Sequence, residues 1–121
     1  MKRDLELIRK ILFKIEDATD RDLTICDLSS DPQEFSIISF HIELLLDAKF
    51  IVAKRLRFIG KAYPDFYIQR LTNDGCDYLD SIRDNKVWTK TKEKLKAVGG
   101  TMSFEVVKDL ALSLAKLHLG L

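Results

Sequence analysis

Apolar residues recur every three or four positions in two stretches of the N-terminal half of the chain. The first runs from Asp4 to Asp17, and this spacing places its apolar side chains on one face of a helix. The second is Ser36 to Ile51, SIISFHIELLLDAKFI, around which we expect the rest of the chain to be organised. At its start, Phe35 and Ser36 resemble a hydrophobic staple residue and an N-cap. The pattern therefore predicts an N-terminal helix and a central helix.

After Lys49 the period of the pattern shortens to that of a strand. The residues from Phe50 to Ile59 and from Asp65 to Leu71 predict two strands, with a tip at residues 60–64. Basic and apolar residues alternate along the first strand. A helix, an immediate corner and a strand with a basic face are typical of a recognition helix that runs into a wing. A core helix followed by an ordinary hairpin remains the alternative.

The segment before the central helix is short. Thr24 to Leu28 is predicted as a brief strand, and Pro32 can open a helical turn. An ordinary helix-turn-helix has a complete helix in front of its recognition helix. Here only Asp31 to Phe35 is available for it, which is about one turn. We therefore expect a supporting helix that is shortened or replaced by a loop.

Two further helices are predicted over residues 73–84 and 85–98. Thr72 is placed to cap the first of them. Gly75 lies in its first turn, which indicates that another backbone segment packs closely there. The second has an apolar stripe around Trp88 and a lysine-rich face opposite to it, which we interpret as a solvated face.

The last predicted helix starts at Thr101 or Ser103 and runs to about His118. Its apolar residues follow heptad-like steps to Leu121 and cover more surface than one small core requires. Such an excess is usually buried by a partner chain. The positions expected at an interface between two copies of the chain are Phe104, Val107, Leu110, Ala111, Leu114 and Leu117.

Composition limits the function classes. A chain of 121 residues with 46% hydrophobic and 32% charged residues is an ordinary globular domain with one core. Lys and Arg number 20 and Asp and Glu 19, so the net charge of +1 requires any nucleic-acid binding to depend on a local patch. No apolar run is long enough to cross a membrane, and the charged N-terminus does not resemble a signal peptide. These features predict a cytoplasmic protein.

The sequence offers little chemistry. Cys26 and Cys76 lack zinc-site spacing, and we expect reduced, part-buried thiols. No P-loop, dinucleotide fingerprint, nucleophile elbow or zinc-protease motif is present. Asp77 and Asp80 suggest a solvated acidic face rather than a metal site. His41 could contact phosphate, but a hydrogen bond at the edge of the core is the favoured interpretation. We expect no enzyme activity, cofactor, metal or small-molecule ligand.

A basic patch on the predicted wing is the strongest functional signal. It consists of four cations with no acidic residue between Phe50 and Tyr63: Lys54, Arg55, Arg57 and Lys61. Such a wing could hold phosphates or enter the minor groove, although charge also protects exposed hairpin edges. The central helix carries a charge of −1. None of its outward candidates is an Arg, Lys, Asn or Gln that would read base edges; they are Ser36, Ile37, Ser39, Phe40 and Glu43. This favours weak or nonspecific readout of DNA, or a protein partner.

The chain also resembles a known family. The segments that carry the resemblance are MKRDLELIRKIL, FHIELLLDAKFI, RLTNDGCDYLDSIRDNKVW and AVGGTMSFEVVKDL. They are similar to blocks of a family of small, uncharacterised bacterial proteins, often encoded in prophages, with a domain of unknown function of winged-helix type. The third block is the most specific and the MKRD start the next. The family has no established activity, so the resemblance implies a fold and no function.

The chain departs from that family at three positions. Lys49 stands where the resemblance implies a glycine at the helix end, so Lys49 must take a left-handed conformation or the corner must be less sharp. Asn73 and Cys76 stand where the family tends to carry an aromatic residue and a histidine. Any role of those side chains would be absent here.

The sequence thus predicts an α+β fold that is mostly helical. A winged helix-turn-helix with a shortened supporting helix spans residues 1–84, and two C-terminal helices over residues 85–121 belong to the same single domain. Two functions remain open. One is a small transcription regulator that binds duplex DNA as a homodimer through the wing cations. The other is a winged-helix protein-interaction module, such as a phage accessory factor, that binds through its C-terminal helix.

Overall fold

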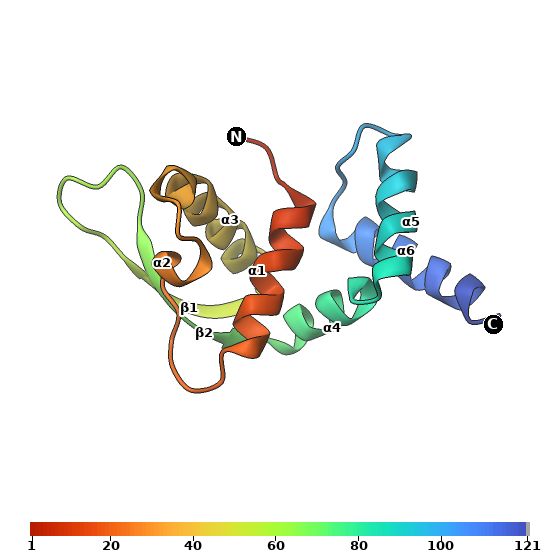
Figure 1. The fold of residues 1–121 in the computed structure, drawn as a ribbon, viewed down its shortest axis with the longest axis horizontal. Helices are drawn as coiled ribbons and strands as arrows, with labels where there is room; N and C mark the ends of the chain where they lie inside the picture. Colours follow the sequence, from red (N-terminus) through yellow and green to blue (C-terminus); the bar gives the residue numbers. More distant parts are fainter. Residues whose placement is uncertain (121) are drawn as a thin grey trace. The chain divides into compact units, whose positions relative to one another are not determined.

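A computed structural model describes residues 1–120 and has an α+β fold in which helices dominate (Figure 1). The α+β prediction is confirmed, whereas the expected heptad position Leu121 lies outside the described residues. In chain order the elements are α1 (Leu5–Asp17), α2 (Ile25–Leu28), the 3-10 turn η1 (Pro32–Glu34), α3 (Phe35–Asp47), β1 (Ile51–Leu56), β2 (Asp65–Leu71), α4 (Asn73–Ile82), α5 (Asn85–Lys96) and α6 (Phe104–His118).

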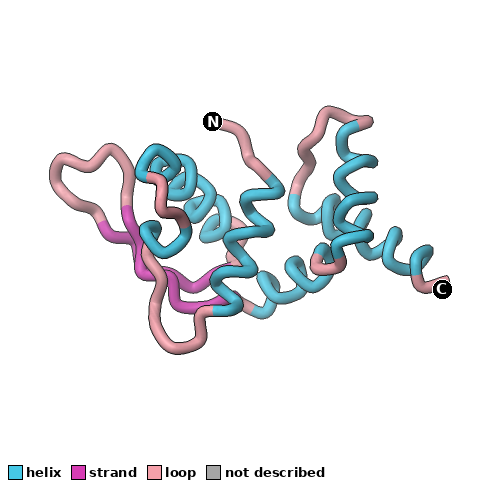
Figure 2. The backbone as a smooth tube through the Cα atoms, in the orientation of Figure 1, coloured by secondary structure: helices cyan, strands magenta, loops and turns pink. Residues whose placement is uncertain are grey.

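The chain divides into two compact units, Met1–Cys76 and the residues from Asp77 onward. The first unit contains both strands, which form an antiparallel hairpin, and the helices α1 to α3 (Figure 2). The second unit is helical. No helix of residues 1–120 is long and apolar enough to cross a membrane.

The core of the first unit forms where α1 and α3 pack against each other and α1 packs on β2. The apolar faces predicted from the helical period are the buried ones, with Ile8 and Leu12 of α1 and Ile42 of α3 all at 0% exposure. Asp4 caps α1, because its carboxylate accepts the N–H groups of Glu6 at 3.0 Å and Leu7 at 3.1 Å. Helical periodicity therefore located the main interior surface correctly.

α3 begins at Phe35, two residues before the start that an N-cap at Ser36 would give, so the assignment of Ser36 as its N-cap is wrong. Pro32 opens η1, whose cap is Asp31, and the 3-10 turn runs directly into α3. Because the chain is already helical at Glu34, no side-chain cap is needed at the start of α3. The predicted helical turn after Pro32 is confirmed.

The end of α3 is a Schellman motif built without glycine. The N–H of Phe50 bonds to the carbonyl of Leu45 at 3.0 Å, and the N–H of Lys49 bonds to that of Leu46 at 3.0 Å. Lys49 has a φ of 61°. Of the two alternatives expected for this position, the left-handed conformation is therefore the one that the chain adopts. A residue with a side chain adopts this conformation at a cost of about 1–2 kcal/mol.

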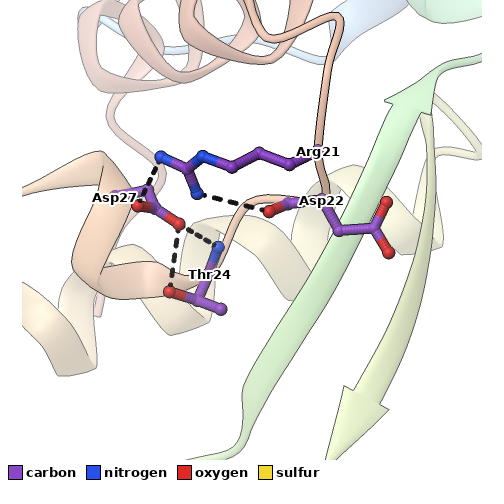
Figure 3. A network of polar contacts seen from close by, with 4 residues as sticks. All are labelled: Arg21, Asp22, Thr24 and Asp27. Atoms are coloured by element: carbon purple, nitrogen blue, oxygen red, sulfur yellow. Dashed lines mark hydrogen bonds and ion pairs between the residues drawn. The ribbon is translucent and has the colours of Figure 1, made fainter.

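The predicted strand at Thr24 to Leu28 is wrong, because α2 is helical. The carboxylate of Asp27 accepts the N–H of Thr24 at 2.8 Å and its hydroxyl at 3.2 Å, and it pairs with Arg21 at 3.0 Å (Figure 3). These local bonds stabilise a helical turn at the expense of a strand. Extended pairing is confined to Leu23, which forms an isolated antiparallel bridge with Ile68 of β2.

Gly75 lies where α4 approaches the end of α3, and it is buried. A Cβ atom at this position would overlap the backbone carbonyl of Phe50, so only glycine fits without a shift of the backbone. Thr72 fixes the approach: its hydroxyl donates to the carbonyl of Lys49 at 2.6 Å and accepts the N–H of Gly75 at 3.0 Å. The predicted close packing at Gly75 and the predicted cap at Thr72 are both confirmed.

In the second unit α5 and α6 pack on each other. Trp88 and Leu95 of α5, each 2% exposed, and Val107 and Ala111 of α6, each 0% exposed, belong to its interior. The ring of Tyr78 meets that of Phe104 edge-on at 5.1 Å between centroids. Asp84 caps the start of α5, and Ser103, one of the two residues predicted to start the last helix, caps α6.

Candidate nucleic-acid interface

The tip of the β1–β2 hairpin is a defined turn. β1 ends at Leu56, three residues before the predicted end at Ile59, so the connecting segment is longer than the sequence pattern indicated. Within it the N–H of Lys61 donates to the carbonyl of Phe58 at 3.2 Å, and Gly60 between them has a φ of 83°. A positive φ at the third position is the requirement of a type II turn. Ile59 occupies the second position, at the outer corner.

The four predicted hairpin cations, Lys54, Arg55, Arg57 and Lys61, are all exposed. Arg55 differs from the others because its guanidinium pairs with Glu43 of α3. Lys54, Arg57 and Lys61, which we call the unpaired hairpin cations, form no ion pair within residues 1–120. The structure thus keeps three cations on one hairpin available to an outside anion.

The predicted outward set on α3 is partly wrong. Ser36 and Phe40 are half-buried, but Ser39 is only 1% exposed. The hydroxyl of Ser39 donates to the carbonyl of Pro64 at 2.7 Å, so it ties α3 to the end of the hairpin loop. Ser39 therefore has a structural contact and no surface to offer a groove. The helical period could not reveal this, because it does not show where the hairpin loop returns.

His41 is fully buried, which agrees with the favoured interpretation. Its Nε2 accepts the N–H of Asp4 at 2.8 Å, and its Nδ1 lies 2.8 Å from the carbonyl of Ile37. An acceptor at Nε2 and a carbonyl beside Nδ1 together require the neutral ring with its proton on Nδ1. His41 thus links α3 to the start of α1.

The electrostatics of the first unit centre on α2. The guanidinium of Arg21, followed by the N–H of Thr24, lowers the pKa of Asp27 to about 2. Hydrogen bonding to Asp27 in turn raises the pKa of Arg21 above its ordinary value. Arg21 also reaches the carbonyl of Asp22 at 3.5 Å (Figure 3). This network stabilises the segment before α3.

The thiols and carboxylates give no catalytic constellation. Cys26 and Cys76 are free, as expected, but both are exposed, so the prediction of part-buried thiols is wrong. Asp80 pairs with Arg83 at 2.9 Å. Among residues 1–120 no three His, Cys, Asp or Glu side chains are grouped as a metal site would require.

The predicted interface on α6 divides into two classes. Val107 and Ala111 have 0% exposure, so they belong to the chain's own interior and are unavailable to a partner. Phe104, Leu110 and Leu114 are half-buried, and Leu117 is 74% exposed. The apolar surface extends to Leu112 and Leu119, at 43% and 70% exposure, which the predicted set omitted. The heptad spacing did not distinguish these two classes, because it does not show which positions α5 covers.

A groove of about 800 Å³ lies between α1 and the chain from Leu28 to Ile38. Its apolar lining includes Phe13 and Ile37, and the Nζ of Lys14 crosses to the carbonyl of Leu28 at 2.9 Å. Sequence analysis missed this groove, because it arises from the path of an irregular segment. It brings together no cluster of unsatisfied polar groups, so it is a weaker candidate site than the hairpin.

The described residues form a small α+β protein with an exposed basic hairpin. Residues 2–101 match the model of a family described as "Hypothetical protein (DUF2513)". The chain belongs to this family of unknown function, as the resemblance indicated. It is also 28% identical, over 111 residues, to an uncharacterized protein of Haemophilus influenzae strain Rd, a match that covers 92% of each chain. No solved structure matches it.

Proposed function

We propose that this protein is a winged-helix DNA-binding regulator without enzyme activity, acting in the cytoplasm. The order of elements supports the winged-helix assignment. A first helix, a short bridge at Leu23, two helical turns, the helix α3 and a hairpin follow one another in the order of that class. The turns α2 and η1 take the place of the complete supporting helix. In this interpretation α3 is the recognition helix and the β1–β2 hairpin is the wing.

The observation that carries the proposal is the trio of unpaired hairpin cations. Lys54, Arg57 and Lys61 are exposed, form no internal ion pair, and lie on a hairpin with no acidic residue between Phe50 and Tyr63. A hairpin edge protected from aggregation needs charge, but it does not need three cations within one short hairpin. Phosphate oxygens of duplex DNA are the anions that such a wing reaches most readily.

The character of α3 favours weak sequence discrimination. Within α3 the charged residues are Glu43 and Asp47, and no Arg, Lys, Asn or Gln side chain is present to pair with base edges. Glu43 is neutralised by Arg55, which lowers the repulsion between α3 and the phosphates. The affinity for DNA therefore has to come from contacts between the hairpin cations and the DNA phosphates. Such affinity must fall as the salt concentration rises.

The test is fluorescence anisotropy of a labelled random duplex. Three phosphate contacts predict an affinity that falls about 40-fold between about 50 and 200 mM salt. The variant Lys54→Ala/Arg57→Ala/Lys61→Ala should lose nearly all binding and the salt dependence. Salt-independent binding, or equal binding by this variant, would contradict the proposal.

A matched control separates the hairpin from bulk charge. The variant Lys86→Ala/Lys90→Ala/Lys94→Ala removes the same three charges from exposed positions of α5. It should keep most of the affinity, since these lysines lie on another element. Equal losses in the two variants would mean that net charge alone, rather than the hairpin, determines binding.

Exposed leucines on α6 favour a second candidate, a protein-interaction module. Leu117 and Leu119 at 74% and 70% exposure form an apolar surface together with Leu112. A second copy of the chain would cover such a surface and make the regulator a homodimer. Sedimentation of the wild type and of Leu117→Asp tests this: a concentration-dependent dimer that Leu117→Asp dissociates supports it. In a protein-interaction module without DNA binding, Leu117→Asp would weaken partner binding, and the hairpin variant would leave partner binding unchanged.

A further inference from the structure

Ile59 is the most exposed large apolar side chain of the hairpin, at 107% of its reference surface. It occupies the outer corner of the turn, where Pro or a small polar residue would be ordinary. Its side chain contributes nothing to the interior of the protein. A single exposed aliphatic residue is ordinary on a protein surface, but two exposed cations, Arg57 and Lys61, flank this one.

The backbone of the turn at the tip directs Ile59 away from the protein. The Lys61-to-Phe58 hydrogen bond of 3.2 Å closes the turn, and Gly60 supplies the positive φ that the turn requires. Phe58, 54% exposed, lines a small cavity of about 100 Å³ together with Phe35 and Tyr63. Phe58 therefore faces its own protein on one side, whereas the neighbouring Ile59 projects into solvent.

We propose that Ile59 inserts as a wedge between base pairs of duplex DNA from the minor groove and kinks the duplex. This inference rests on the proposed function. Arg57 and Lys61 lie two residues to either side of Ile59 and form no internal ion pair within residues 1–120. Apolar wedges flanked by Arg or Lys are the means by which minor-groove proteins unstack a base step while holding the adjacent phosphates.

An exposed isoleucine between two cations could also bind an anionic membrane. The size of each contribution decides between a membrane and duplex DNA. Burial of one isoleucine contributes about tenfold to a hundredfold in affinity, and each cation near an anionic surface contributes about fivefold. The total is comparable to that of a single lipid chain, which gives only marginal membrane binding. A base step accepts a single inserted side chain, and its unstacking cost of a few kcal/mol is offset by the isoleucine together with the phosphate contacts of the flanking cations.

The wedge gives the protein a source of selectivity that α3 lacks. Pyrimidine–purine steps unstack and kink most easily, so insertion favours sites that contain them without any contact to base edges. We therefore expect sites with a TA or CA step beneath the hairpin to bind more tightly than A-tracts of equal length.

The experiment measures bending and affinity together. Fluorescence resonance energy transfer between the two ends of a duplex with a central TA step reports the kink, and anisotropy reports binding. The wild type should bring the ends closer. Ile59→Ser should bind about tenfold more weakly, retain the salt dependence set by the hairpin cations, and leave the duplex straight. Ile59→Leu should restore the bend. Because Ile59 is fully exposed, neither variant should change stability.

Each other result has a separate meaning. Salt-dependent binding by the wild type without a bend, or an unchanged bend with Ile59→Ser, overturns the wedge and leaves the proposed function standing. The absence of salt-dependent DNA binding overturns both. Phosphatidylserine vesicles form the last arm: binding to them that Ile59→Ser abolishes, without bending of DNA, assigns the tip to a membrane surface instead.

Discussion

The helix α3 and the tip of the hairpin are close in sequence but use their side chains in opposite ways. On α3, Ser39 bonds to Pro64, His41 bonds to Asp4, and Glu43 pairs with Arg55. At the tip, Arg57, Ile59 and Lys61 are exposed. Three polar side chains of α3 are therefore engaged in contacts that stabilise the fold. The hairpin carries the groups that remain available, so binding should depend on the hairpin more than on the helix.

Packing explains the difference. α3 contacts α1, α2, η1 and β1, so most of its circumference faces other parts of the first unit. A polar side chain there must find a partner inside the protein or remain unsatisfied at a cost of about 1–3 kcal/mol. Beyond Leu56 the hairpin leaves the sheet, and its outer residues meet water. Substitutions near α3 should therefore reduce stability, and substitutions at the tip should reduce binding.

The largest effect is expected where α4 packs on the end of α3. Gly75→Ala places a Cβ atom on the carbonyl of Phe50 and should destabilise the protein by at least about 3 kcal/mol. Gly60→Ala at the tip meets open space and should cost only about 1–2 kcal/mol, through its positive φ. Urea unfolding of both variants measures the difference. Equal losses would mean that Gly75 is not constrained by packing.

The next effect concerns the link between α3 and α1. His41→Phe keeps an aromatic ring but leaves the N–H of Asp4 without its acceptor, so it should cost about 1–3 kcal/mol. His41→Ala adds a cavity at a fully buried site and should cost about 3 kcal/mol or more. Denaturant midpoints provide the measurement. A neutral His41→Phe would show that the two hydrogen bonds do not stabilise the fold.

A smaller effect is expected at the contact between α3 and the hairpin loop. Ser39→Ala leaves the carbonyl of Pro64 without its donor and should cost about 1–2 kcal/mol. Ser36→Ala, at a half-buried position on the same helix, should stay within about 0.5 kcal/mol. Thermal unfolding of the pair checks the prediction. If the two substitutions were equivalent, Ser39 would be free to face outward after all.

The smallest effect is expected from Asp27 and depends on pH. Its pKa is lowered from 3.8 to about 2 in the folded protein, so its stabilising contribution is complete above about pH 4 and is lost as pH falls through about 2. Arg21 is 59% exposed, and solvent screening limits the contribution to about 1 kcal/mol. Unfolding of the wild type and Asp27→Asn between pH 5 and 2 measures it. Parallel pH profiles would contradict this assignment.

Part of the site was predictable from the sequence. The basic run from Lys54 to Lys61 and the lack of acids around it are visible in the sequence, and the family resemblance implied that Lys49 stands in place of a glycine. Two exposed features were missed: the isoleucine at the tip and the groove beside α1. Ile59 was taken for the end of a strand, because apolar character alone does not show that the chain has already left the sheet.

The sequence by itself determined the helices other than α2, the hairpin, the cap at Thr72 and the close packing at Gly75. The helices and the cap depend on residues near one another in the chain, so local periodicity and capping reveal them. At Gly75 the glycine itself signalled the contact with the distant backbone of Phe50. Only the tertiary structure decided that Ser39 and Val107 face the interior while Ile59 and Leu117 face solvent. Periodicity defines the faces of an element, but the segments that cover each face arrive from distant parts of the chain.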